Sequence, residues 1–122
     1  MNTDFKINIF NEVNGVAAVS SIDGKTVCEK IKAAITNKKH VILDFLNIEF
    51  ITSAFLNTAI GSLFKDFSDS TIDTIELINI SESDKKLYFQ VKERAKEYYR
   101  NPDYREKLIE ALKEEIIEDG NN

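Results

Sequence analysis

Few side chains in this sequence are of the types that carry out chemistry, and they do not cluster. The single histidine, His40, follows two lysines just before an apolar run, and one histidine does not supply a two-histidine metal site. Cys28 is the only cysteine, and its place in a segment with helical periodicity is typical of a small packing residue. The sequence has no phosphate loop and no GxGxxG motif. We therefore expect no catalytic site, no metal and no cofactor.

Two polar residues beside apolar runs are candidates for a binding site. Asp44 is the one acid in the apolar run 41–45, where it must be paired, hydrogen-bonded or close to the exposed end of a strand. It is either a turn acid or a ligand contact at the carboxyl end of a sheet, where the ligands of α/β proteins gather. Ser53 opens a predicted helix, so it is either an ordinary amino-terminal cap or a residue whose phosphate the helix dipole would stabilise.

The elements that must position these residues follow from the spacing of apolar side chains. Residues 5–10 alternate apolar and polar side chains, which predicts a strand that is buried on one face. Asn14 and Gly15 then tolerate positive φ, and residues 16–19 can return as a second, antiparallel strand. The sequence therefore predicts an opening β-hairpin.

A strand–helix–strand unit is predicted in the middle of the chain. A helix over about 24–36, capped by Asp23, precedes the run 41–45, which is apolar enough to be the central strand of a sheet. Apolar side chains at helical spacing predict the next helix at about 54–67, and residues 74–80 are rich in β-branched side chains. Such a unit connects parallel strands. We therefore expect a mixed β-sheet of about four strands packed by helices.

Two helices are predicted after the sheet, at about 82–100 and 103–118. Apolar side chains recur at helical spacing in both stretches, and Pro102 separates them. The chain has the usual length of one domain. We therefore expect a single α/β domain over residues 1–122, with its core in residues 1–80 and two C-terminal helices.

Composition and charge restrict the class of protein. The 122 residues are 43% hydrophobic and 30% charged, a balance that is typical of a globular protein that folds by itself. The net charge of −5 disfavours nucleic acid as a partner, since proteins that bind it concentrate basic side chains on one face. No segment approaches the roughly 20 apolar residues that span a bilayer, and there is no pair of cysteines. We therefore expect a cytoplasmic protein without membrane contact.

The segment 41–64, VILDFLNIEFITSAFLNTAIGSLF, resembles the signature of STAS-like domains and is similar to the STAS-like family of unknown function DUF4325. Related domains include the anti-sigma-factor antagonists, in which a strand ending in Leu-Asp leads to a loop with Asp-Ser-Ser/Thr-Gly and then to a helix that binds the partner. Ser53 falls on the serine that is phosphorylated in those relatives. Thr52, Ala54 and Phe55 differ from the loop pattern.

The resemblance implies a STAS-like fold and a non-enzymatic, bacterial regulatory module that docks on another protein. The implied partner is a histidine-kinase-like ATPase or an anti-sigma factor, and phosphorylation of Ser53 would switch the contact. Docking would use the loop and helix that start at Thr52-Ser53. Residues one helical turn apart share a side, and a glycine permits close backbone approach. The expected docking face therefore consists of Thr52, Ser53, Asn57, Thr58 and Gly61.

Two other functions are consistent with the same sequence. The first is a sensor that binds a nucleotide or another small molecule at the carboxyl end of the sheet, near Asp44 and Thr52-Ser53. Binding of the ligand would raise the melting temperature of the protein, which distinguishes this function from the others. The second is a homo-oligomer in which the C-terminal helix packs on a copy of itself through an apolar stripe. The stripe consists of Tyr104, Leu108, Leu112 and Ile116.

Overall fold

A parallel sheet of three strands organises the structure, a computed structural model that describes the backbone of residues 3–120 and the side chains of residues 3–113. The strand β3 (His40–Asp44) lies between β1 (Asp4–Asn8) and β5 (Glu76–Ile78) and is parallel to both. It is also more buried than its two neighbours. The prediction that this apolar run is the central strand of the sheet is therefore confirmed.

A second pair of strands is also parallel, and the predicted opening hairpin is wrong. β2 (Ala17–Ala18) pairs with β4 (Phe50–Ile51), far along the chain, instead of with β1. The helix α1 (Ile9–Val13) follows β1 directly, because the Asn8 side chain accepts a hydrogen bond from an N–H of its first turn (2.9 Å). Asn14, at φ 58°, ends this helix and does not turn a hairpin. Every strand pairing among the described residues is parallel, so the expected mixed sheet is also wrong.

A side-chain cap sets where the helix before β3 begins. Ser20 accepts a hydrogen bond from the backbone N–H of Asp23 (3.0 Å). The helix α2 (Ser21–Thr36) therefore begins three residues before the predicted start, and its cap is Ser20 and not Asp23.

The single helix predicted after β4 consists of two helices. α3 (Ser53–Ala59) ends at Ile60, whose φ of −116° departs from the helical value, and the 3₁₀ helix η1 (Gly61–Lys65) follows. A short helix, α4 (Asp69–Ile72), is capped by Ser68 and leads to β5. The change from α to 3₁₀ geometry lets the apolar stripe of the predicted helix stay buried along both pieces.

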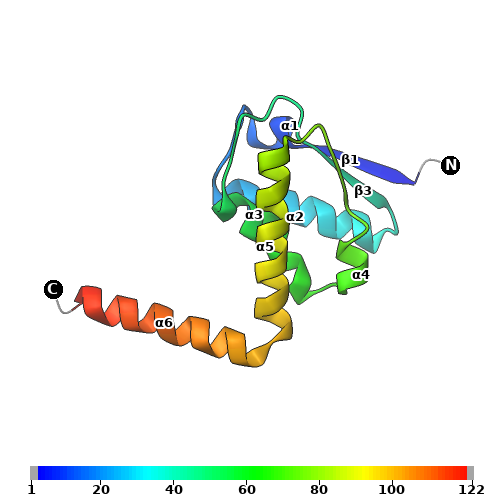
Figure 1. The fold of residues 1–122 in the computed structure, drawn as a ribbon. Coiled ribbons are helices and arrows are strands. Elements are labelled where there is room, and N and C mark those ends of the chain that lie inside the picture. The colour runs from blue at the N-terminus through cyan, green and yellow to red at the C-terminus, as the bar shows by residue number, and fades with distance from the viewer. Residues whose placement is uncertain (1–2, 121–122) are drawn as a thin grey trace.

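The hydrophobic core is shared by the sheet and the helices packed around α2. α2 contacts β1, β3 and α3, while the long helix α5 (Glu82–Arg100) contacts α3 and η1 and crosses in front of α3 in Figure 1. Apolar side chains from all of these layers are buried, and α5 contributes Tyr88 and Val91. The largest fully buried side chains come from the other elements. They are Ile7, Ile9, Val27, Ile31, Val41, Leu43, Phe55, Leu56, Ile60, Leu63, Phe64 and Ile72.

α2 and α3 approach each other closely at Gly24, which is buried in the first turn of α2. A Cβ atom on this residue would overlap both the Thr58 hydroxyl and the backbone carbonyl oxygen of Phe55. The Thr58 hydroxyl lies 3.0 Å from the carbonyl oxygen of Ser21 and donates a hydrogen bond across the contact. The crossing of the two helices therefore requires glycine at position 24.

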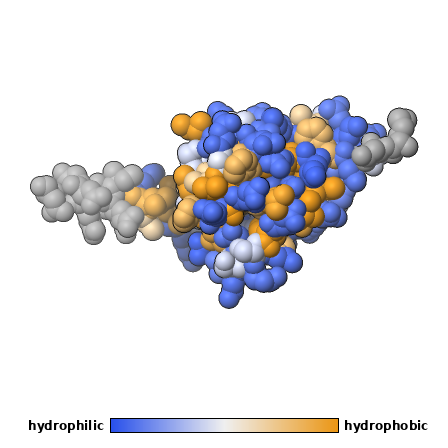
Figure 2. Space-filling view, turned by 90° about the horizontal axis from the view of Figure 1, so that it is seen from above, coloured by the Kyte–Doolittle hydropathy of each residue, from blue (hydrophilic) through white to orange (hydrophobic). Residues whose placement is uncertain are grey.

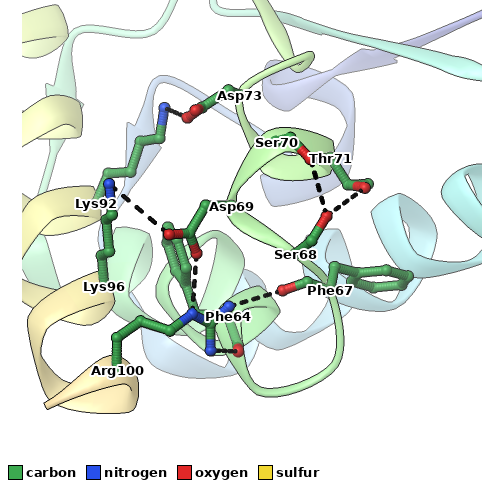
Figure 3. Close-up of polar contacts among 10 residues, drawn as sticks. All are labelled: Phe64, Phe67, Ser68, Asp69, Ser70, Thr71, Asp73, Lys92, Lys96 and Arg100. Atoms are coloured by element: carbon green, nitrogen blue, oxygen red, sulfur yellow. Dashed lines mark hydrogen bonds and ion pairs between the residues drawn. The ribbon is translucent and has the colours of Figure 1, made fainter.

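Basic side chains at four-residue spacing hold α5 against the segment around α4 (Figure 3). The ammonium nitrogen of Lys92 lies 2.5 Å from a carboxylate oxygen of Asp73, and that of Lys96 lies 3.7 Å from Asp69. Residues four positions apart share one face of a helix. One face of α5 is therefore basic and lies against the acids of α4 and of the residue that follows it.

Arg100 makes the largest number of these contacts. Its Nη1 and Nη2 atoms donate hydrogen bonds to the carbonyl oxygens of Phe64 (2.8 Å) and Phe67 (2.9 Å), and its Nε donates to Asp69 (3.0 Å) (Figure 3). The guanidinium also lies over the Phe64 ring, 5.6 Å from its centroid. Arg100 therefore satisfies carbonyl groups at the end of η1 and joins the end of α5 to them.

The last helix, α6 (Pro102–Gly120), leaves the end of α5 and projects away from the rest of the structure (Figure 1). Proline is favoured in the first turn of a helix because the N–H that it lacks has no partner there. The Asn101 side chain accepts a hydrogen bond from the backbone N–H of Tyr104 (3.2 Å). Neither α6 nor any other helix in the described range is long and apolar enough to cross a membrane.

Part of the apolar stripe expected to mediate self-association is exposed on α6. Leu108 exposes 37% of its surface and Leu112 exposes 50%, and the neighbouring Ile109 exposes 38%. The side chain of Ile116 lies outside the described residues. Self-association through α6 stays a prediction.

Replacing Gly24 with alanine tests the contact between α2 and α3. Alanine favours a helix over glycine by about 1 kcal/mol, but the overlap with a backbone carbonyl outweighs this gain. We expect a net loss of about 1–3 kcal/mol in the free energy of unfolding, the usual cost of overpacking, measured by urea unfolding. Adding Thr58→Ala should restore only part of the loss, because the Phe55 carbonyl remains. Lys25→Ala, at the exposed neighbouring position, is the control and should change stability by less than about 0.5 kcal/mol.

Replacing Arg100 with glutamine tests the attachment of α5. The variant loses charge-assisted hydrogen bonds to two carbonyl groups and Asp69, so the free energy of unfolding should fall by about 1–3 kcal/mol. Arg105→Gln is the control and should change stability little. It removes the same charge, but the Arg105 side chain makes no hydrogen bond or ion pair in the described part of the chain. Equal losses of stability for the two variants in urea unfolding would contradict this role of Arg100.

Candidate functional site

Thr52 and Ser53 are neighbours, but their hydroxyl groups have different surroundings. The Thr52 hydroxyl accepts a hydrogen bond from the backbone N–H of Phe55 (3.2 Å) and donates one to the carbonyl oxygen of Val19 (2.7 Å). Thr52 is therefore the cap of α3, and it joins the start of this helix to the end of β2. Ser53 is the first residue of α3, is exposed, and its hydroxyl makes no hydrogen bond among the described residues.

The other three residues of the expected docking face do not lie together with Ser53 on one open surface. Thr58 is half-buried at the contact between α2 and α3, where its hydroxyl is already hydrogen-bonded. Gly61 is buried, and a Cβ atom there would lie 3.3 Å from the Cβ of Ala95 on α5. The missing side chain of Gly61 thus serves the packing of α5. Asn57 is exposed and faces a pocket beside α5 and α6.

Asp44 is buried at the carboxyl end of β3 with internal partners. Its carboxylate accepts hydrogen bonds from the backbone N–H of Leu46 (3.0 Å) and from the amide of Asn79 (2.9 Å), and the ammonium of Lys6 is 3.8 Å away. Burial by itself raises the pKa of Asp44, but the hydrogen bonds from Asn79 and Leu46 and the charge of Lys6 outweigh it, so the pKa lies below its ordinary value. This geometry is that of a turn acid that joins the end of β3 to the residue after β5 and lies close to Lys6 of β1.

The two other reactive side chains have structural surroundings. The Cys28 sulfur lies 3.2 Å from the Ser62 hydroxyl inside the protein, and burial raises the pKa of the thiol, so the reactive thiolate is disfavoured. His40 lies at the start of β3 with its Nδ1 3.1 Å from a carboxylate oxygen of Asp4. No group of three metal-ligating side chains occurs among the residues that the structure describes.

Large apolar side chains are exposed on the segments that flank Ser53. Ile22 exposes 78% of its surface, Phe50 exposes 59% and Val19 exposes 42%. The hydrogen bonds from Thr52 to Val19 and from Thr58 to Ser21 hold the end of β2 and the start of α2 beside α3. We call Val19, Ile22, Phe50 and Ser53 the Ser53 surface. Apolar groups interrupt the hydrophilic surface in several places, as Figure 2 shows for one face of the molecule.

The exposed apolar side chains of the Ser53 surface were not predicted from the sequence, although their positions in the sequence indicate two of them. Ile22 falls outside the stripe of α2 that Val27 and Ile31 define, so a helical reading leaves it facing solvent. Phe50 and Ile51 are consecutive in a strand and must point to opposite faces. That Val19 lies close to them follows only from the pairing of β2 with β4.

Comparison with known proteins gives one match. A protein-family model described as a STAS-like domain of unknown function (DUF4325) matches residues 23–85. The matched residues run from the first turn of α2 to the first turn of α5, and they include β3, Thr52, Ser53 and α3. No curated protein and no solved structure matches the chain.

Asp44→Asn tests the role of this acid. At pH 7 the variant should lose about 1–3 kcal/mol in the free energy of unfolding, because a neutral amide removes the negative charge that strengthens the hydrogen bonds from Leu46 and Asn79 and attracts the ammonium of Lys6. The pKa of Asp44 is lowered in the folded state, so the stabilisation is present above about pH 4 and is lost as the pH falls through the folded-state pKa.

The measurement is urea unfolding of the wild type and the variant from neutral to acidic pH. The difference in the free energy of unfolding between the two proteins should shrink as the pH falls. A difference that stays constant would contradict the stabilising role of the Asp44 carboxylate. Glu49→Gln, at an exposed carboxylate without an ion pair among the described residues, is the matched control and should show little difference at any pH.

Proposed function

Since the chain belongs to the family of STAS-like domains of unknown function, DUF4325, we propose that it is a non-enzymatic regulatory module that binds another protein through the Ser53 surface. One observation carries this proposal: Val19, Ile22 and Phe50 are exposed beside a serine hydroxyl that has no partner among the described residues. Clustered exposed apolar side chains are typical of protein contact sites.

Burial of the apolar side chains supplies the affinity in this proposal. Full burial of a Phe or Ile side chain contributes roughly 1.5–3 kcal/mol, and Ile22 and Phe50 are more than half exposed in the free protein. The rigid position of the surface helps as well, because Thr52 is bonded on both sides and the start of α3 does not need to become ordered on binding.

The proposed partner is a histidine-kinase-like ATPase or an anti-sigma factor, the classes implied by the resemblance to the anti-sigma-factor antagonists. The net charge of −5 favours a partner whose contact surface has a basic rim. Covalent catalysis needs a nucleophile that is hydrogen-bonded to a base. Cys28 contacts Ser62, His40 contacts Asp4, and Asp44 contacts the backbone of Leu46. These contacts are consistent with a non-enzymatic role.

Phosphorylation of Ser53 is the proposed switch. The hydroxyl is exposed, and the segments that carry Phe50 and Val19 lie beside the start of α3, so a phosphate would place about two negative charges at the edge of an apolar contact. The charges would have to lose water when the partner binds. The phosphorylated protein should therefore bind its partner more weakly.

Affinity capture tests the proposal. The baits are the wild type, Ser53→Asp, Phe50→Ser and the control Phe5→Ser, which removes another exposed phenylalanine from β1, outside the Ser53 surface. We expect the wild type and Phe5→Ser to recover a kinase-like ATPase or an anti-sigma factor from a lysate of the source organism. With the purified partner, calorimetry should show about a tenfold or larger loss of affinity for Ser53→Asp and Phe50→Ser.

Two results would contradict the proposal. Equal affinity of Phe50→Ser and Phe5→Ser for the partner would remove the Ser53 surface as the contact. If the intact mass of the protein isolated from its source shows no added phosphate under any growth condition, the switch is wrong, although the contact itself would stand.

A further inference from the structure

A pocket of about 450 Å³ opens between α3, η1, α5 and α6, and none of the four residues of the Ser53 surface lines it. Its volume lies within the range of sites that hold small molecules. The side chains that define its chemistry are Asn57, Arg94, Tyr98, Tyr99, Tyr104 and Leu108. Three of these are aromatic, and they come from two helices that only the fold brings together.

The charge of the pocket is opposite to that of the protein. The chain has a net charge of −5, but the residues lining the pocket include Arg94 and no acid. Asp66, the acid that influences Tyr99, is paired with Lys32 at 2.9 Å. An anion in the pocket would therefore meet a cation without a competing carboxylate in its wall.

The guanidinium of Arg94 is available for a ligand. Lys92, Lys96 and Arg100 on the same helix are all paired with acids of the α4 segment. Arg94, by contrast, makes no hydrogen bond or ion pair in the described part of the chain, and it is exposed. A guanidinium binds carboxylate, sulfonate and phosphate groups through paired hydrogen bonds.

The remaining polar groups of the pocket are also mainly donors without internal partners. The hydroxyl groups of Tyr98, Tyr99 and Tyr104 and the amide of Asn57 make no hydrogen bond among the described residues. The rings of Tyr98 and Tyr99 meet edge to face with centroids 4.9 Å apart, and both residues line the pocket, where aromatic side chains favour an aromatic ligand. Leu108 adds an apolar wall.

We propose that this pocket binds a small aromatic anion, whose ring packs against the tyrosines and whose anionic group pairs with Arg94. The ligand would contact Asn57 of α3, Arg94 of α5 and Tyr104 of α6 together. In the described part of the chain α6 makes its main contacts with α5. An occupied pocket would therefore add a connection between α6 and the α3–η1 segment.

The probe for the test is anilinonaphthalene sulfonate, an aromatic anion whose fluorescence rises on binding, and its neutral analogue is phenylnaphthylamine. We expect the sulfonate to saturate one site per chain and the neutral dye to bind more weakly. Arg94→Gln should weaken binding of the sulfonate about tenfold, which is about 1.4 kcal/mol, and leave the neutral dye unchanged. Arg105→Gln, which removes the same charge outside the pocket wall, should leave both affinities unchanged.

Further variants separate the pocket from the other apolar surfaces. Tyr104→Ala should weaken both dyes, because it removes an aromatic wall, whereas Phe50→Ser should weaken neither. Arg94 has no partner among the described residues, so Arg94→Gln should melt at the temperature of the wild type. Equal affinity of the wild type and Arg94→Gln for the sulfonate would overturn the proposal, as would loss of binding in Phe50→Ser or binding of the sulfonate that does not saturate at one per chain.

Discussion

The close crossing of α2 and α3 at Gly24 determines where the other functional parts of this protein lie. Because a Cβ atom would overlap the Thr58 hydroxyl and the Phe55 carbonyl, the two helices reach this distance only with glycine. The approach lets Thr58 donate a hydrogen bond to Ser21, near the bond from Thr52 to Val19. These two bonds place the start of α3 beside the chain that joins β2 to α2, and the Ser53 surface exists only because of that arrangement.

The other side of α3 is covered by α5, and this divides the residues of one short helix between two regions. Lys92, Lys96 and Arg100 hold α5 against the α4 segment, and Gly61 leaves room for Ala95. The start of α3 therefore belongs to the Ser53 surface. Asn57, one turn later, lines the pocket that contains Tyr98, Tyr99 and Tyr104, which we call the aromatic pocket. A helix of seven residues thus contributes to the Ser53 surface and to the pocket.

Some polar side chains of this fold have partners within it and are not available for external contacts. Thr52 caps α3, Thr58 bridges two helices, and Asp44 accepts hydrogen bonds from Leu46 and Asn79. Buried polar groups need such partners, since desolvation without them costs more than a hydrogen bond returns. The groups without a partner among the described residues include the Ser53 hydroxyl, the Arg94 guanidinium and the tyrosine hydroxyls of the pocket, and these are left for external contacts.

The sequence alone was sufficient for features that depend on neighbouring residues. Apolar periodicity located α2, α5, α6 and the central strand β3, and the segment 41–64 carried the family. It missed α1 and α4 and predicted α3 and η1 as one helix. It did not reveal that Asn14 ends a helix, that β2 pairs with β4, or that Gly61 lies under α5. The physical reason is that strand pairing and helix packing join residues far apart in the chain, while periodicity shows which face of an element is buried and not what covers it. The Ser53 surface and the aromatic pocket were therefore decided by the tertiary structure.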